Sequence, residues 1–239
     1  MAEGSFSHSY SPPVRPDTGA GRRKLLLIPA ILCNLAIVIM ECIAFRMLWQ
    51  VDPTFSHQVI FYTNQSNFFA LIGSALFVLF GTAALFRDGR IPHGLHVFRL
   101  MCSVMLYNTF IVILYGFIGM AYTAGPGAFA AMYGGSMFVM HLLAPLVSVA
   151  SLIFFEGEPL LTLGDTVTAV LYNYAYAIVM VILNAVGKVD GPYPFLQVDV
   201  NPWYINLMYA AILLPGAYLV SLCGKWLSNG IAGRLSGEK

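Results

Sequence analysis

The chain has 239 residues, of which 59% are hydrophobic and only 10% are charged. An ordinary soluble domain carries about 25% charged residues, so this composition excludes both a soluble globular domain and a disordered chain. A formal net charge of +1 provides no basic surface for a polyanion, and we therefore expect no nucleic-acid partner. The class that remains is a membrane protein with several spans and short loops.

Six apolar stretches are long enough to cross a hydrocarbon core of about 30 Å, which requires roughly 20 residues per helix. The pattern therefore predicts an all-α polytopic membrane protein with six transmembrane helices. In chain order, the predicted spans are residues 25–48, 59–86, 98–120, 133–155, 166–186 and 204–227.

Basic residues are distributed unequally between the two sides of these spans, and such a bias predicts orientation. Residues 22–24 read Arg-Arg-Lys just before the first span, and Lys225 and Arg234 lie near the end of the chain. We therefore expect both termini in the cytoplasm, with the fourth loop on the same side. That loop is acidic and contains Glu156, Glu158 and Asp165.

The regions outside the spans are short. Residues 1–24 are rich in Ser, Pro and Gly, which is typical of disorder, and we expect a disordered cytoplasmic tail there. Residues 25–228 then form the six-helix transmembrane domain, and residues 229–239 form a second cytoplasmic tail. In a prokaryote the expected location is the plasma membrane.

Cysteines and histidines give no sign of a cofactor site. The four cysteines form no Cys-x-x-Cys pair, and His141 is the one histidine inside a predicted span. A membrane haem held by paired histidines would lack its second ligand. We therefore expect neither a metal nor an organic cofactor.

The second predicted span opens with five consecutive polar residues, Thr63, Asn64, Gln65, Ser66 and Asn67. Thr63, Ser66 and Asn67 are spaced i, i+3 and i+4, so they share one helical face. Polar and ionisable groups inside a span usually face the bundle interior and often mark function.

Other polar residues are expected at a similar depth. At about 1.5 Å per helical residue, Glu41 of the first span and His141 of the fourth both fall in the outer half of the membrane. Asn184, near the end of the fifth span, and Asn206, near the start of the sixth, reach the same level.

Two interpretations of this polar cluster are open. In the first, it is an interhelical hydrogen-bond network that holds the bundle together. In the second, His141 removes the proton from Thr63 or Ser66, and the oxygen attacks an acyl carbonyl. Asn and Gln amides would donate to the resulting oxyanion, and Glu41 is a candidate to orient the imidazole. Spacing alone does not choose between Thr63 and Ser66.

Three segments carry a family resemblance. Residues 61–67 (Phe-Tyr-Thr-Asn-Gln-Ser-Asn) resemble the second-span signature of the androgen-induced-protein family of membrane hydrolases, particularly its prokaryotic members. Residues 140–145 (Met-His-Leu-Leu-Ala-Pro) resemble the fourth-span histidine motif of that family. Residues 192–196 (Pro-Tyr-Pro-Phe-Leu), with Asp199, resemble the fifth loop of the prokaryotic members. The resemblance covers roughly residues 25–228.

This resemblance implies a chemistry. Animal members of the family are threonine hydrolases that cleave fatty acid esters of hydroxy fatty acids, so the nucleophile would be Thr63 and the general base His141. We therefore expect a hydrolase acting on a lipid or fatty-acyl ester; an acyltransferase would use the same residues. The alternatives are a small-solute or proton transporter and a non-catalytic scaffold or sensor. The pocket and oxyanion candidates are Glu41, Asn64, Gln65, Ser66, Asn67, Asn184 and Asn206.

Overall fold

The computed structural model describes residues 20–124, 127–157 and 159–236, in which every regular element is a helix. Six helical segments of this part of the chain are long and apolar enough to cross a membrane, which confirms the expected all-α, six-span architecture. They are α1 (Ala20–Val51), α3 (Tyr62–Leu85), the His93–Gly116 part of α4 (His93–Ala124), the segment Ser136–Phe154, α8 (Leu163–Ala185) and the Trp203–Gly233 part of α9 (Trp203–Ser236).

The expected tails are partly helical. The helix α1 begins at Ala20, inside the stretch predicted to be disordered, and α9 continues to Ser236. Residues 1–19 and 237–239 lie outside the described residues. Three short elements that hydropathy did not predict lie in the loops: α2 (Phe55–Gln58), α5 (Gly127–Tyr133) and η2 (Pro194–Leu196).

The fourth span is not a uniform α-helix. It consists of α6 (Ser136–Phe138), a π-helical turn η1 (Val139–Leu143) and α7 (Ala144–Phe154). Pro145 has no N–H and cannot bond to the carbonyl of His141 four residues earlier, where its ring would also clash. The helix widens over this stretch, and such π-turns are frequent at functional sites.

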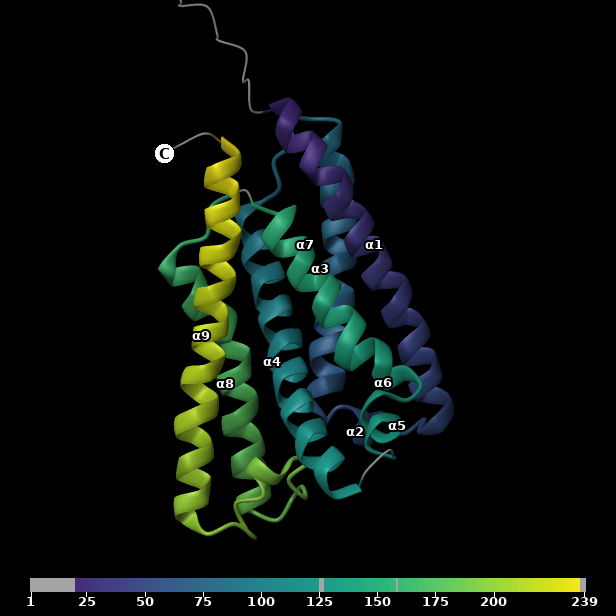
Figure 1. Cartoon of the computed structure of the whole chain (residues 1–239), viewed down its shortest axis with the longest axis vertical. Helices are drawn as coiled ribbons and strands as arrows, with labels where there is room; N and C mark the ends of the chain where they lie inside the picture. The colour runs from purple at the N-terminus through teal and green to yellow at the C-terminus, as the bar shows by residue number, and fades with distance from the viewer. Residues whose placement is uncertain (1–19, 125–126, 158, 237–239) are drawn as a thin grey trace, which may run out of the picture.

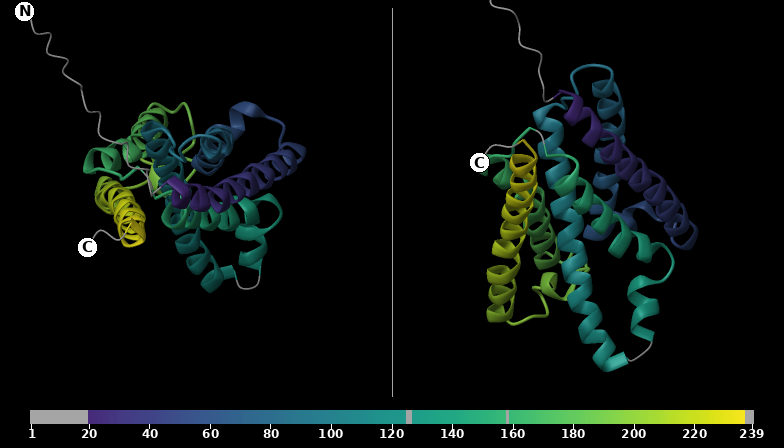
Figure 2. Two further views of the ribbon diagram at one scale, coloured as in Figure 1. Left: turned by 90° about the horizontal axis from the view of Figure 1, so that it is seen from above. Right: turned by 45° about the horizontal axis from the view of Figure 1, so that its top comes forward.

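Both described chain ends, Ala20 and Ser236, lie at the same end of the bundle, here called the terminal end (Figure 1). The opposite end, called the distal end, carries α2, α5 and the loop over residues 186–202. Helix α4 is central because it packs against α3, α7, α8 and α9. Figure 2 shows α1 and α3 on one side of this helix and α8 and α9 on the other.

Three layers stack along the bundle where α1, α3, α4 and α7 meet. The middle layer is apolar and fully buried, and consists of Ile37, Ala70, Leu106 and Ala144. One helical turn toward the terminal end, the same helices place a polar layer of Asn34, Ser74, Ser103 and Ser148. One turn toward the distal end, they place a second polar layer of Glu41, Asn67, Thr109 and His141.

The terminal polar layer surrounds a buried ion pair between Arg99 of α4 and Glu156, which follows α7. The guanidinium donates twice to the carboxylate, each time at 3.2 Å, and also donates to Ser74 at 3.2 Å and Ser148 at 3.3 Å. Asn34 and Ser151 donate to the same carboxylate at 2.9 Å and 2.5 Å.

Glu156 lies in the loop after α7, as the sequence predicts, but its side chain is buried instead of facing water. Glu156 is buried because the Arg99 charge inside the bundle requires a charged and hydrogen-bonded partner. Asp165 has a different role, since it forms a capping box with Thr162 at the start of α8. Glu158 lies outside the described residues.

Replacement of Arg99 by Met should destabilise the protein by about 3–5 kcal/mol, because it leaves the buried Glu156 charge unpaired. Reversible unfolding in mixed micelles measures this change. The double variant Arg99→Met, Glu156→Leu should recover part of the loss, since it removes both charges. The exposed Arg87→Met change should stay within about 0.5 kcal/mol of wild type. An Arg99→Met protein as stable as wild type would contradict the role given to the pair.

Candidate functional site

Asn67 joins the second and fourth spans in the distal polar layer. Its amide nitrogen donates to the carbonyl oxygen of Thr63 at 2.7 Å and to that of Met140 at 3.4 Å. The hydroxyl of the preceding residue, Ser66, lies 3.1 Å from the hydroxyl of Thr109 on α4. The segments that carry Thr63 and His141 are therefore bridged by one buried side chain.

His141 is held by the backbone. Its Nδ1 lies 2.6 Å from the carbonyl oxygen of Met132, and its ring packs edge-on against Tyr133. A carbonyl oxygen only accepts, so Nδ1 carries the proton and Nε2 of the neutral ring is left as the basic nitrogen.

Glu41 does not orient His141, contrary to the suggested triad. The Glu41 side chain is fully buried, and neither carboxylate oxygen has a hydrogen-bond partner among the described residues. The Met132 carbonyl takes the orienting role instead. The side-chain oxygen of Asn67 is likewise buried without a partner in the described part of the chain.

The amides expected to stabilise an oxyanion are already in use. Asn64 donates to the backbone and side-chain oxygens of Gln58, at 3.0 and 2.6 Å, and Asn67 uses both amide protons as described above. Gln65 donates to the carbonyl of Val59 and accepts from the Tyr172 hydroxyl. These bonds fix the start of α3 and leave neither Asn64 nor Asn67 a free amide proton.

The distal loop over residues 186–202 brings an additional hydroxyl to Thr63. The Tyr193 hydroxyl accepts from the Thr63 backbone N–H at 3.2 Å and lies 3.3 Å from the Thr63 hydroxyl. The Tyr193 ring stacks on Phe195, with ring centroids 5.2 Å apart. Burial raises the pKa of Tyr193 above its ordinary value, so its hydroxyl stays protonated and able to donate.

Asn184, at the end of α8, organises this loop. Its side-chain oxygen accepts from the backbone N–H groups of Val198 at 2.7 Å and Asp199 at 3.3 Å, and its amide donates to Val189 at 3.1 Å. Asn206 donates to the carbonyl of Asn201 at 3.4 Å, and its oxygen is buried without a partner among the described residues.

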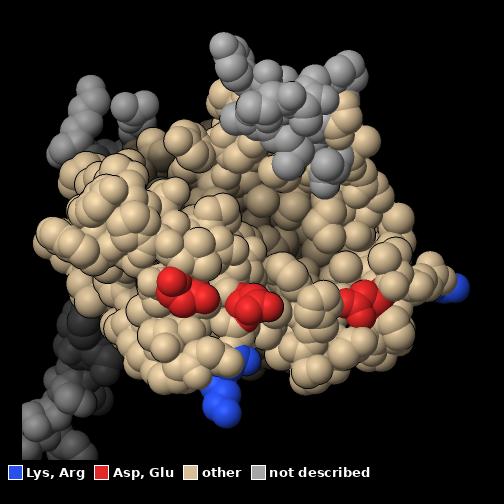
Figure 3. Space-filling model, turned by 90° about the horizontal axis from the view of Figure 1, so that it is seen from below, with Lys and Arg blue, Asp and Glu red and all other residues tan. Residues whose placement is uncertain are grey.

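A cavity of about 670 Å³ lies between α3, α4, α8, α9 and the distal loop. Of the predicted site residues, Thr63 and Asn206 line it, whereas His141, Glu41, Asn64, Gln65, Ser66, Asn67 and Asn184 do not. Figure 3 shows the distal face of the molecule, which is hollowed and carries few charged side chains.

The wall of this cavity is uncharged and mostly aliphatic. Its polar groups come from Tyr, Asn and Thr side chains, and no Asp, Glu, Lys, Arg or His lines it. Ile178 and Ile182 of α8 and Ile212 of α9 are all exposed lining residues. Ile111 of α4 is a further exposed lining residue, so the cavity reaches the apolar outer surface of the bundle along α4, α8 and α9.

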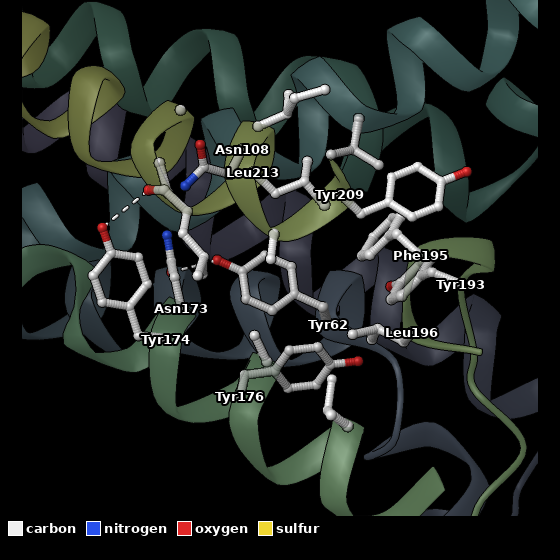
Figure 4. A pocket seen from close by; sticks show the side chains of 18 of the residues that line it. Tyr62, Asn108, Asn173, Tyr174, Tyr176, Tyr193, Phe195, Leu196, Tyr209 and Leu213 are labelled. Carbon is white, nitrogen blue, oxygen red and sulfur yellow. Dashed lines mark hydrogen bonds between the residues drawn. The ribbon is translucent and has the colours of Figure 1, made fainter. Parts of the chain in front are cut away.

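Tyr62, Asn108, Asn173 and Tyr193 are polar lining residues that were not predicted as site residues. Figure 4 shows Asn108 and Asn173 at one end of the cavity and Tyr193 with Phe195 at the other. The sequence carries one faint signal, a Tyr-Asn pair repeated at 107–108 and 172–173. Tyr193 lies 130 residues from Thr63 along the chain, and no local pattern connects them.

No protein-family model, curated protein or solved structure matches the chain.

Replacement of Asn184 by Leu should release the distal loop, because three backbone groups lose their partner. Amide hydrogen exchange at Val198 should accelerate by at least about tenfold. Lys188→Ala, an exposed change in the same loop, should leave that rate unaltered. Unchanged exchange at Val198 in a folded Asn184→Leu protein would show that the loop is held by something else.

Proposed function

We propose that the protein is a membrane-embedded lipid ester hydrolase in which Thr63 is the nucleophile and His141 the general base. The observation that carries the proposal is the position of Thr63. Its buried hydroxyl lines an uncharged cavity open to lipid, while Asn67 connects its backbone to the segment that carries His141. A threonine hydroxyl needs a base to become nucleophilic, and Nε2 of His141 is the basic nitrogen proposed for that role. The Thr63 hydroxyl contacts Tyr193, and no hydrogen bond joins it to His141 in the described part of the chain. The proposal therefore requires the two side chains to approach each other when substrate binds.

The chemical steps balance as an acyl transfer to water. The Thr63 oxygen attacks the ester carbonyl and its proton passes to Nε2 of His141. Collapse of the tetrahedral intermediate expels the alcohol, which takes that proton and leaves an acyl-threonine. Water, deprotonated by His141, then attacks the acyl-threonine and releases the fatty acid and free Thr63.

In this proposal Tyr193 stabilises the oxyanion. The amide protons of Asn64 and Asn67 are already donated to protein acceptors, whereas the Tyr193 hydroxyl touches Thr63 and retains a proton to donate. Its pKa is raised, so the group remains a donor at neutral pH.

The cavity fits an acyl substrate by size and chemistry. Ligand sites are commonly about 300–1,000 Å³ with mainly apolar walls, and this one is within that range. Fatty acid esters of hydroxy fatty acids are the substrates that the family resemblance implies, and they are the first to assay. Since no charged side chain lines the cavity, their free carboxylate would have to stay outside it, in water. We further propose that the terminal end is cytoplasmic, as the basic flanks predict.

The layered core argues against a transporter. A polar path across the membrane would have to connect the two polar layers, but the fully buried residues Ile37, Ala70, Leu106 and Ala144 lie between them. A non-catalytic scaffold would give no covalent chemistry at Thr63, so labelling separates it from a hydrolase.

A fluorophosphonate probe should label Thr63 in membranes that contain the wild-type protein. Thr63→Ala should abolish labelling, and His141→Ala should slow it by at least about 100-fold, since a general base contributes that much or more. Thr63→Ser keeps a hydroxyl and should still react. Intact-protein and peptide mass spectrometry locate the adduct.

Ser66→Ala is the matched control for this experiment, because Ser66 lies one turn away on the same helix face. Labelling that survives Thr63→Ala and disappears in Ser66→Ala would transfer the nucleophile to Ser66. An unlabelled wild-type protein that also hydrolyses no lipid ester would refute the proposal.

Tyr193→Phe should lower ester hydrolysis by about 10²–10³-fold, the usual cost of losing one oxyanion donor, with a smaller effect on KM. The matched control is Tyr218→Phe, which changes a tyrosine outside the cavity lining and should keep wild-type activity. Equal rates for Tyr193→Phe and wild type would remove Tyr193 from the mechanism.

A further inference from the structure

Two amide groups at the end of the cavity farthest from Tyr193 have no hydrogen-bond acceptor. The Nδ2 atoms of Asn108 and Asn173 are buried and unpartnered among the described residues, and both residues line the cavity. Buried donors are rarely left unmatched, because each loses its hydrogen bond to water without a replacement. An unmatched pair in one cavity points to a ligand that supplies the acceptor.

The two residues lie at one level on packed helices. Val104 of α4 and Val170 of α8 belong to the same buried cluster, and Asn108 and Asn173 follow them by about one helical turn on parallel helices that pack together. Figure 4 shows the two amide groups at the same end of the cavity.

The direction of the Asn173 amide is fixed by Tyr62. The Tyr62 hydroxyl donates to the side-chain oxygen of Asn173 at 2.5 Å, which leaves the NH₂ group free to donate elsewhere. The side chain of Asn108 makes no hydrogen bond to a described residue. The site therefore offers donors and needs an acceptor.

The uncharged wall of the cavity predicts that its ligand is uncharged. No charged side chain lines the cavity, and an ionised carboxylate or phosphate buried there would be unpaired and costly. A carbonyl oxygen is neutral and has two lone pairs, so it can accept from both amides. The exposed isoleucines of α4, α8 and α9 that line the cavity give an apolar chain access from the bilayer.

We propose that this end of the cavity binds the carbonyl oxygen of an uncharged acyl lipid, with Asn108 and Asn173 as the two donors. Ionised fatty acids and charged headgroups are excluded from it. This binding requires no chemistry at Thr63, so it is independent of the proposed hydrolase activity.

The test uses a long-chain methyl ketone, which has a carbonyl oxygen and no bond to hydrolyse. The full chain is reconstituted in nanodiscs of ether-linked lipids, which contain no competing carbonyls. The infrared carbonyl band of the bound ketone should shift to lower frequency than in empty discs. The ketone should bind at least about tenfold more tightly than an alkane of equal length.

Asn108→Leu and Asn173→Leu should each move the band back toward the frequency of the free ketone and reduce the ketone-to-alkane preference by about fivefold. Asn108→Leu is the cleaner variant because it breaks no other hydrogen bond. Asn229→Leu, the same change at the terminal end where Asn229 bonds to Leu161, should retain the band and the preference in any protein that folds.

Equal binding of ketone and alkane by wild type, or an unshifted band, would overturn the proposal. So would a preference that survives both cavity variants. The Thr63→Ala protein separates this inference from the proposed function: it should still bind the ketone although it hydrolyses no ester. Retained ketone binding in a protein without any hydrolase activity would refute the hydrolase alone.

Discussion

A polar group inside hydrocarbon has no water to bond with, so its partners must come from the bundle itself. In this protein the requirement is met most completely around Arg99 and Glu156, where hydrogen bonds converge from α1, α3, α4 and α7. This network sets the register of four helices along their axes. The apolar layer lies one helical turn from this network toward the distal end, and the distal polar layer lies one turn further. Both therefore follow from the same register.

The two ends of the bundle differ in how completely their buried polar groups are hydrogen-bonded. Near the terminal end, the ion pair and the capping box of α8 use nearly all available donors and acceptors. Most of the buried atoms that have no partner among the described residues lie on the distal side of the apolar layer, on Glu41, Asn67, Asn108, Asn173 and Asn206. The π-turn at His141 belongs to the same half. Departures from complete hydrogen bonding tend to concentrate at functional sites, and this asymmetry supports the distal half as the location of the proposed site.

The spans could be predicted from sequence because hydropathy over about 20 residues is a local property, and helical spacing placed Thr63, Ser66 and Asn67 on one buried face. The hydrogen-bond and ion-pair partners of these buried groups could not be predicted in this way, because they come from distant parts of the chain. Sequence places Glu156 in an acidic loop but does not reveal its ion pair, because only the fold brings Arg99 beside it. The hydroxyl next to Thr63 comes from Tyr193 in a distant loop, and Asn108 and Asn173 are adjacent only because α4 packs on α8.

The access of the cavity to the apolar outer surface of the bundle has a consequence for how its occupancy is controlled. A molecule that enters there arrives from the bilayer, where long acyl chains are concentrated many-fold over water. Occupancy then follows the mole fraction of the lipid in the membrane rather than its aqueous concentration. Loading of the cavity would respond to the composition and fluidity of the surrounding leaflet, and dilution of the aqueous phase would leave it unchanged.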